Sequence, residues 1–180
     1  DLPGENMGFL PDPVWKEKAS GRKWLLGDTY NVSIGQGDFL ITPLELLSYI
    51  STIANGGTIY RPYLMSAVLG ENGKVLKAQG SRVKSDLASL FARFLNVVQG
   101  GMEDAVLSPY GTAYMLHDLP APFAGKTGSA QIEGNTKTNA FFVGYGPVSN
   151  NQDTRNNNQT NDETLQSTKP EIAILVLIED

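Results

Sequence analysis

The run Lys126-Thr127-Gly128-Ser129, preceded by Gly125, decides how the rest of this chain is interpreted. It combines a cation, two hydroxyl groups and a residue without a side chain, within a segment rich in apolar residues and bounded by turn formers, which predicts a strand. Side chains two positions apart face the same way along a strand, so Thr127 and Ser129 are expected to present their hydroxyls together. Gly128 lets another backbone approach closely, and Lys126 adds positive charge. This set of groups suits an anionic ligand.

Three strands are predicted in the last third of the chain, at Phe123 to Ile132, Asn139 to Tyr145 and Glu171 to Glu179, and they suggest an antiparallel meander. The polar stretch 149–169 has nothing to bury and is expected to be a mobile loop. The last strand is apolar at every position from Ile172 to Ile178, so both of its faces should be covered. A strand of that kind needs neighbours on two edges, and we therefore expect part of the sheet to lie outside this chain.

A helix is predicted to begin at Thr42, which can act as N-cap, with Pro43 at the first helical position and Glu45 closing a capping box. An apolar face follows, and Asn55-Gly56-Gly57 is expected to end the helix. A second helix is predicted from a cap at Ser85, with an apolar face at spacings of three and four residues: Leu87, Leu90, Phe91, Phe94, Leu95 and Val98. Gly100-Gly101 is expected to stop it.

Between these helices, Asn72-Gly73 separates two short apolar runs and predicts a tight hairpin. Residues Asp1 to Thr29 show no helical or alternating period and predict an irregular segment. Gly35-Gln36-Gly37 suits a tight turn or a close approach of two backbones.

Composition excludes several classes of function. The chain has 180 residues, of which 41% are hydrophobic and 18% charged, as expected for a single globular domain. A net charge of −5 and a pI near 4.9 argue against nucleic acid as a partner. The absence of cysteine excludes disulfides, thiolate metal sites and a cysteine nucleophile. We expect neither a metal nor a cofactor.

A Lys-Thr-Gly run on a strand is one of three signatures of penicillin-binding proteins and serine β-lactamases, and other stretches of the chain resemble the same proteins. Those that resemble class B penicillin-binding proteins are Gly27-Asp28-Thr29-Tyr30-Asn31-Val32-Ser33-Ile34-Gly35-Gln36-Gly37, Thr42-Pro43-Leu44, Ile53-Ala54-Asn55-Gly56-Gly57 and Gly111-Thr112-Ala113. Two further runs resemble the cell-elongation subgroup, the penicillin-binding protein 2 type: Asp1-Leu2-Pro3-Gly4-Glu5 and Pro11-Asp12-Pro13-Val14-Trp15. The resemblance covers nearly the whole chain apart from the polar loop.

This resemblance implies an α/β (α+β) fold of the β-lactamase/transpeptidase type, an antiparallel sheet flanked by helices, with residues 1–180 forming the C-terminal part of the domain. The implied reaction is acyl transfer, in which a serine attacks the penultimate D-alanine carbonyl of a peptidoglycan stem peptide ending in D-Ala-D-Ala, and a neighbouring amine then takes the acyl group. β-Lactams would bind the same cleft. The resemblance further implies the extracytoplasmic face of the bacterial plasma membrane, an N-terminal anchor outside this chain, and elongation-complex membrane proteins as partners.

By the same resemblance, Lys126, Thr127, Gly128 and Ser129 form one wall of the cleft. Thr127 and Ser129 would bind the terminal carboxylate of the substrate, and the Ser129 N–H would supply half of an oxyanion hole. Lys126 would support the proton transfers. Lys126 and Ser129 are therefore the expected catalytic residues, and all four are expected to bind substrate.

The chain departs from the family pattern because the nucleophile motif Ser-x-x-Lys and the motif Ser-x-Asn should precede the region where it begins. Formal matches exist at Ser20 to Lys23, at Ser81 to Lys84 and at Ser149-Asn150-Asn151. The family's nucleophile opens a buried helix, whereas Ser20 is expected in an irregular segment and Ser81 beside a hairpin. We interpret all three as chance matches, and we expect the missing N-terminal part of the domain to carry the nucleophile.

Other interpretations of single motifs are weaker. A phosphate-binding loop that ends in Gly125-Lys126-Thr127 needs another glycine five residues before Gly125, where the chain has Pro120. His117, the only histidine, has no evident partner for a catalytic triad. The acidic pairs Glu103-Asp104 and Glu179-Asp180 are better explained as solvated turns than as a glycosidase pair. The aromatic residues of the second strand, Phe141, Phe142 and Tyr145, are expected in the core.

The main hypothesis is an enzyme whose nucleophile lies upstream of this chain. The sequence leaves two alternatives open. The chain could belong to a non-catalytic module of the same fold that binds peptidoglycan peptides or another cell-wall protein. It could also be one fragment of a nicked domain whose other fragment carries the nucleophile.

Overall fold

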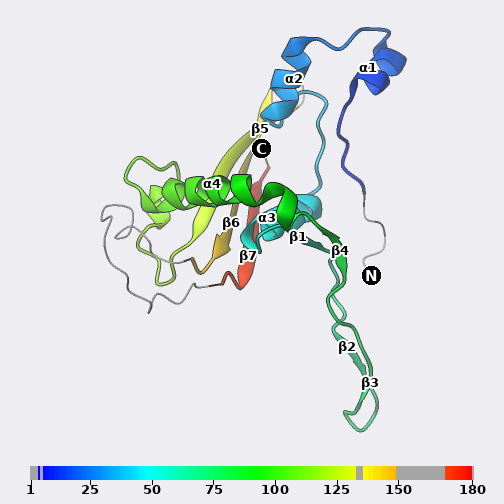
Figure 1. Ribbon diagram of the computed structural model, residues 1–180, viewed down its shortest axis with the longest axis vertical. Helices are drawn as coiled ribbons and strands as arrows, with labels where there is room; N and C mark the ends of the chain where they lie inside the picture. The colour runs from blue at the N-terminus through cyan, green and yellow to red at the C-terminus, as the bar shows by residue number, and fades with distance from the viewer. Residues whose placement is uncertain (1–3, 5, 133–135, 149–168, 180) are drawn as a thin grey trace.

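The computed structural model of the chain describes residues 4, 6–132, 136–148 and 169–179 (Figure 1). In chain order its elements are α1 Pro13–Ser20, α2 Leu26–Ser33, α3 Pro43–Ala54, β1 Thr58–Tyr60, β2 Ala67–Leu69, β3 Val75–Ala78, β4 Val83–Asp86, α4 Ala88–Leu107, a 3-10 turn Tyr114–Leu116, β5 Ala124–Ile132, β6 Lys137–Gly146 and β7 Ile172–Ile178. The predicted mobile loop 149–169, apart from Lys169, and the Ser149-Asn150-Asn151 match lie outside the described residues.

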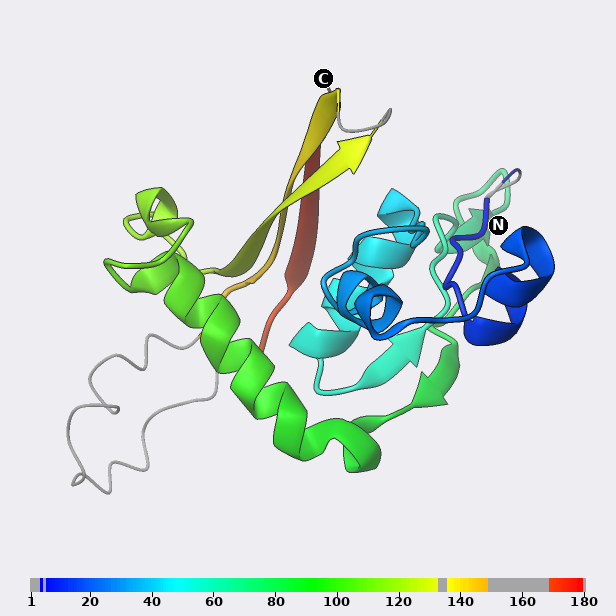
Figure 2. The ribbon, with the colours of Figure 1, turned by 90° about the horizontal axis from the view of Figure 1, so that it is seen from above.

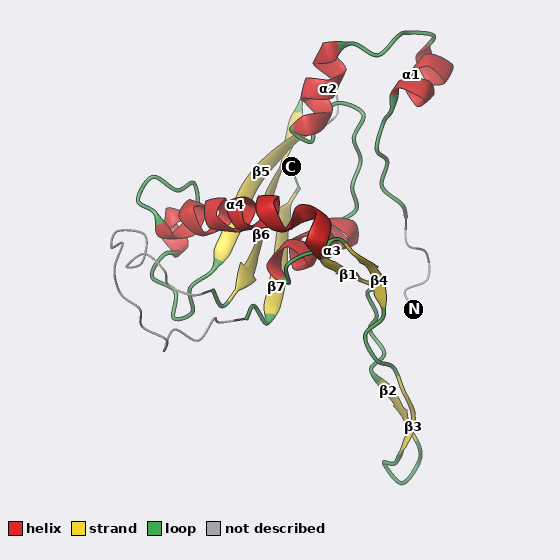
Figure 3. Ribbon diagram, viewed as in Figure 1, coloured by secondary structure: helices red, strands yellow, loops and turns green. Residues whose placement is uncertain are grey.

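The last three strands form one antiparallel sheet in the order β5-β6-β7, which confirms the predicted meander (Figure 3). Lys126 of β5 pairs with Val143 of β6, which in turn pairs with Leu175 of β7. Within the described residues, β5 and β7 are therefore the two edges of the sheet, and the Lys-Thr-Gly run lies on one of them.

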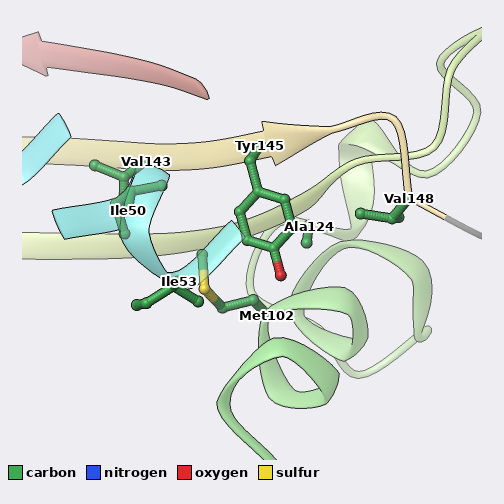
Figure 4. Packing of buried hydrophobic residues seen from close by; sticks show 7 residues of the cluster. All are labelled: Ile50, Ile53, Met102, Ala124, Val143, Tyr145 and Val148. Carbon is green, nitrogen blue, oxygen red and sulfur yellow. The ribbon is translucent and has the colours of Figure 1, made fainter. Parts of the chain in front are cut away.

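The core lies where α3 and α4 meet this sheet. Helix α3 packs against β6 and β7, and α4 packs against β5, so the helices stand beside the three strands when the molecule is seen from above (Figure 2). Figure 4 shows the buried cluster that joins them: Ile50, Ile53, Met102, Ala124, Val143, Tyr145 and Val148. The fold is thus an antiparallel sheet flanked by helices, as predicted.

Helix α3 begins and ends as its sequence predicts. The Thr42 hydroxyl accepts a hydrogen bond from the Glu45 N–H at 3.2 Å, and the Glu45 carboxylate accepts one from the Thr42 N–H at 3.0 Å. This is the capping box, with Pro43 at the first helical position. After the helix, Gly56 and Gly57 take φ values of 84° and 115°, which lie in the region that favours glycine.

The prediction for the second helix is wrong at both ends. Ser85 lies in β4 opposite Ile59, and the helix begins at Ala88, whose N–H is bonded by the Asp86 carboxylate at 2.9 Å. The helix then continues through Gly100-Gly101 to Leu107. A mid-helix glycine costs about 1 kcal/mol relative to alanine. Burial of Met102 and Val106, which are 5% and 0% exposed, outweighs that cost and requires the helix to continue for more than one turn beyond Gly101.

The prediction of an irregular segment from Asp1 to Thr29 is wrong in part, because α1 and the first half of α2 lie within it. Asp12 caps α1 by accepting from the Trp15 N–H at 2.8 Å, and Gly21 ends it in the left-handed region. Both helices have eight residues and neither has a buried residue, so no apolar period marks them. The sequence signals that mark α1 are Asp12 at its N-cap and Gly21 at its C-cap.

The prediction that both faces of the last strand are covered is wrong for the described residues. Ala173 and Leu175 of β7 pack against the core cluster, but Ile172, Val176 and Ile178 on the other face are 54%, 49% and 65% exposed.

The hairpin prediction is confirmed, since β2 and β3 pair around Asn72-Gly73, and this hairpin projects from the body as an arm (Figure 1). None of the helices described by the structure is long and apolar enough to cross a bilayer.

Candidate active site on the edge of strand β5

The outer edge of β5 carries the groups that the sequence singled out. The Ser129 carbonyl accepts a hydrogen bond from the Gln36 carboxamide at 3.2 Å, and the Thr127 carbonyl accepts one from the Lys126 ammonium. In an antiparallel ladder, a residue has its N–H and its C=O on the same side of the strand, and the next residue has both on the other side. The peptide groups of Thr127 and Ser129 therefore point away from β6, and the Ser129 N–H faces outward.

Lys126 lies at this edge with its side chain exposed. It pairs across the strands with Val143, which is buried against the helices. Residues paired directly across an antiparallel ladder share a face of the sheet. The lysine side chain therefore leaves β5 on the face that carries the helical core and turns to the edge, where its ammonium meets the Thr127 carbonyl.

Thr127 is held by a residue that precedes the strand. Its hydroxyl is bonded to the Thr112 hydroxyl at 3.0 Å. Thr112 is placed by its neighbours, because the Ala113 N–H donates to the Ala105 carbonyl of α4 at 2.8 Å. A Cβ on Gly111 would lie 2.3 Å from that same carbonyl oxygen. Only glycine allows this loop to lie so close to the end of α4, and the loop carries Thr112 to Thr127.

The two glycines of the run have different surroundings. A Cβ on Gly125 would lie 2.7 Å from the Phe142 ring, so packing inside the sheet requires glycine there. A Cβ on Gly128 would meet only the Phe141 Cβ, at 3.8 Å, an ordinary contact. Nothing in the described part of the fold requires glycine at position 128, so the space over it is open to a ligand.

The chance matches to the nucleophile motif lie away from this edge. Ser20 is the last residue of α1, and its hydroxyl donates to the Lys16 carbonyl at 2.8 Å. Both views of the ribbon show α1 well separated from β5 (Figures 1 and 2). Ser81 is exposed and lies between β3 and β4, next to the projecting arm. Neither serine opens a buried helix.

The remaining candidates have structural explanations. His117 is exposed, stacks on the Tyr114 ring with centroids 4.1 Å apart, and contacts the Tyr114 carbonyl through Nδ1 at 2.8 Å. Tyr145 is 2% exposed and belongs to the core, as predicted. Within the described ranges, no three His, Asp or Glu side chains gather in a way that could hold a metal ion.

Two residues at the site were not assigned a role from sequence. The sequence predicts Gln36 only as part of a turn within a run that resembles the family, and Thr112 only as part of another such run. Each acts through a partner distant in the chain, 93 residues for Gln36 and 15 for Thr112. No local periodicity or capping pattern reports contacts at that separation.

Comparisons with known proteins identify the family of the chain. Residues 1–173 match the family described as the penicillin binding protein transpeptidase domain. The peptidoglycan D,D-transpeptidase MrdA of Acinetobacter baumannii is 28% identical over 200 residues, which cover 100% of this chain and 25% of the relative. MrdA of Salmonella typhimurium is 31% identical over 134 residues, 73% of this chain and 21% of the relative.

Solved structures match over nearly the whole chain. The complex between penicillin-binding protein PBP2 and MreC from Helicobacter pylori has a TM-score of 0.74 at 30% identity, over 99% of this chain and 28% of that one. Pseudomonas aeruginosa PBP2 in complex with WCK 5153 has a TM-score of 0.67 at 26% identity, over 99% of this chain and 35% of that one. The chain spans about a quarter of the length of the curated relatives named above. The family match, the relatives and the sheet with its Lys-Thr-Gly edge strand together show that this chain belongs to the penicillin-binding protein transpeptidase domains, as a class B, PBP2-like member.

Proposed function

We propose that the protein containing this chain is a peptidoglycan D,D-transpeptidase with an acyl-serine mechanism, and that this chain supplies the Lys-Thr-Gly wall of its cleft. One observation carries the proposal. The Lys126 ammonium and the outward Ser129 N–H lie on a strand edge with which no described strand pairs, beside Gly128, where no described neighbour requires a glycine. A cation and an outward N–H at such an edge suit a peptide that ends in a carboxylate.

The proposed roles follow from these positions. The serine oxygen attacks the penultimate D-alanine carbonyl, the bond to the terminal D-alanine breaks, and D-alanine leaves with a proton on its nitrogen; an amine of a second stem peptide then displaces the serine. The Ser129 N–H stabilises the developing oxyanion. The Thr127 and Ser129 hydroxyls bind the substrate carboxylate, and Lys126 supplies positive charge and supports the proton transfers.

Thr127 fills this role only if its hydroxyl hydrogen points at the carboxylate. A threonine hydroxyl donates one hydrogen and accepts at two lone pairs. When the ligand binds, Thr112 therefore donates to Thr127, and Thr127 donates to the ligand. The 3.0 Å separation of the two hydroxyl oxygens fits a hydrogen bond donated by either threonine.

We further propose that residues outside this chain contribute the nucleophile, since neither Ser20 nor Ser81 lies at the β5 edge. The proposed setting is the extracytoplasmic face of the bacterial plasma membrane, with β-lactams as inhibitors. Elongation-complex membrane proteins are proposed partners, supported by the PBP2–MreC complex among the similar structures.

Labelling with a fluorescent penicillin tests the proposal. The complete protein, meaning the polypeptide that joins this chain to its nucleophile-bearing segment, should form one covalent adduct, detected by intact-mass analysis. Lys126→Met should slow acylation by at least about 100-fold, the lower end of the effect expected for a proton-transfer group. Lys74→Met, on the projecting hairpin, should acylate at the wild-type rate.

Two outcomes would contradict the proposal. An adduct on this chain alone would place the nucleophile within it. A complete protein that binds stem peptides without acylation would be the non-catalytic module of the same fold.

A further inference from the structure

The Gly35-Gln36-Gly37 turn has a defined form at the end of α2. The Gly35 N–H donates to the Val32 carbonyl at 3.0 Å, and the Gln36 N–H donates to the Asn31 carbonyl at 2.9 Å. With Gly35 at a φ of 72°, these two bonds form a Schellman motif. The motif fixes the backbone of Gln36 relative to the helix, so the direction in which its side chain leaves the turn is also restricted.

From this turn the Gln36 side chain crosses to the β5 edge. Its Nε2 donates to the Ser129 carbonyl at 3.2 Å, across 93 residues of sequence, and the side chain is half-buried. The contact places a donor on the carbonyl of Ser129, the residue whose outward N–H is the proposed oxyanion donor.

We propose that Gln36 is a positioning residue of the reaction: by holding the Ser129 carbonyl, it keeps the Ser129 N–H aimed at the oxygen of the attacked carbonyl. This inference rests on the proposed transpeptidase function. Gln36 acts through Ser129. A carbonyl oxygen has two lone pairs, so the bond from Gln36 leaves one acceptor position on Ser129 for a substrate amide.

A purely structural role would have a different signature. If the hydrogen bond only tied α2 to the sheet, its loss would lower stability and leave the chemical step of the folded protein unchanged. An oxyanion donor works only when it lies 2.7 to 3.1 Å from the position of the oxyanion, so a small rotation of the Ser129 peptide affects the rate at saturation.

Two variants of the complete protein separate these roles. Gln36→Met keeps the length of the side chain and removes the donor, and Gln36→Glu keeps the shape but can only accept once ionised. Acylation by a fluorescent penicillin is measured over a range of concentrations, which separates the rate at saturation from the half-saturating concentration. Thermal unfolding is measured in parallel. Gln79→Met, at a half-buried position after β3, is the matched control.

We expect both Gln36 variants to lower the saturating acylation rate by about tenfold, less than the 10² to 10³ lost when an oxyanion donor is removed outright. The melting temperature and the half-saturating concentration should change little, and Gln79→Met should behave as wild type. A wild-type saturating rate in Gln36→Met would overturn the inference and leave the proposed function intact. A loss of rate that only tracks a loss of melting temperature would also overturn it. Failure of the wild-type complete protein to acylate would instead refute the proposed function.

Discussion

At the residue scale, the hydroxyl of Thr112 orients that of Thr127 across 3.0 Å. Thr112→Val keeps the shape of the side chain and removes this partner. We expect acylation of the complete protein by a fluorescent penicillin to slow by roughly 2- to 13-fold, because one neutral hydrogen bond contributes about 0.5 to 1.5 kcal/mol and a factor of ten in rate is 1.36 kcal/mol.

Stability should change little in this variant, because Thr112 is exposed. Thr138→Val, at an exposed position on β6, serves as the control for replacing a threonine by valine in this region. A Thr112→Val protein that acylates at the wild-type rate would show that the Thr127 hydroxyl needs no orientation.

Tyr145 is the second residue with a measurable consequence, because its hydroxyl is buried and has no hydrogen-bond partner among the described residues. Burial, and then the charge of Glu103, raise the pKa of Tyr145 to about 12. The folded protein therefore favours the neutral phenol. Its contribution to stability is fully present below pH 10, the ordinary pKa, and is lost as the pH rises from about 10 to about 12.

Tyr145→Phe removes both the unpaired hydroxyl and this ionisation. We expect the variant to be at least as stable as wild type at pH 8, by up to about 1 kcal/mol, and its advantage to grow at pH 11. Denaturant unfolding at the two pH values measures both effects. Tyr110→Phe, where the side chain is 80% exposed, is the control. A less stable Tyr145→Phe at pH 8 would mean that the hydroxyl makes a favourable bond.

At the element scale, the start of α3 also anchors the N-terminal segment. The Glu45 carboxylate accepts from the Gly8 N–H at 2.9 and 3.0 Å in addition to the Thr42 N–H. The bonds from Thr42, and then from Gly8, hold the pKa of Glu45 below its ordinary value of 4.5. A lowered folded pKa contributes stability that is present above 4.5 and is lost as the pH falls through the folded pKa.

Glu45→Gln tests the direction of this dependence of stability on pH. The variant should be less stable than wild type at pH 7, and the two proteins should converge as the pH falls from about 5 toward 3, because only the wild type has a carboxylate to protonate there. Thermal unfolding across this range measures the difference. Glu17→Gln, on the exposed surface of α1, should stay parallel to wild type. Parallel curves for Glu45→Gln would contradict the prediction.

At the scale of the whole molecule, Gly57 lets the end of α3 lie against the start of α4. It has a φ of 115°, its carbonyl accepts from the Leu87 N–H at 3.0 Å, and a Cβ there would lie 2.8 Å from the Ala88 backbone. Gly56 has a φ of 84°, and no atom of the described residues lies within 4 Å of its Cβ position. A side chain at position 56 would therefore meet only backbone strain, whereas one at position 57 would meet both strain and a collision with the Ala88 backbone.

We expect Gly56→Ala to cost about 1 kcal/mol of folding free energy, from the left-handed conformation alone. Gly57→Ala should cost about 3 kcal/mol, because the collision is with backbone that cannot move without separating the two helices. Denaturant unfolding of both variants measures the difference. Equal losses of folding free energy in the two variants would show that the backbone at the helix ends shifts to accommodate the added methyl group.

Local signals in the sequence were sufficient for much of the fold. The capping box at Thr42, the hairpin at Asn72-Gly73 and the three strands of the sheet follow from side-chain capping, from turn residues, and from apolar runs bounded by turn formers. Helix α4 shows where such signals fail, since a stop at Gly100-Gly101 is a local preference of about 1 kcal/mol per glycine. The buried side chains beyond it contribute more.

The sequence by itself determined that a strand would carry Lys126, Thr127 and Ser129 and that this strand resembles the wall of a transpeptidase cleft, because the order of residue types along one strand is a local property. Only the tertiary structure decided that this strand lies at an edge, and that Gln36 and Thr112 hold its peptide and its hydroxyl. Those contacts join parts of the chain that no local pattern relates. They exist because the helices and the sheet bury a common core, which brings the ends of distant elements together.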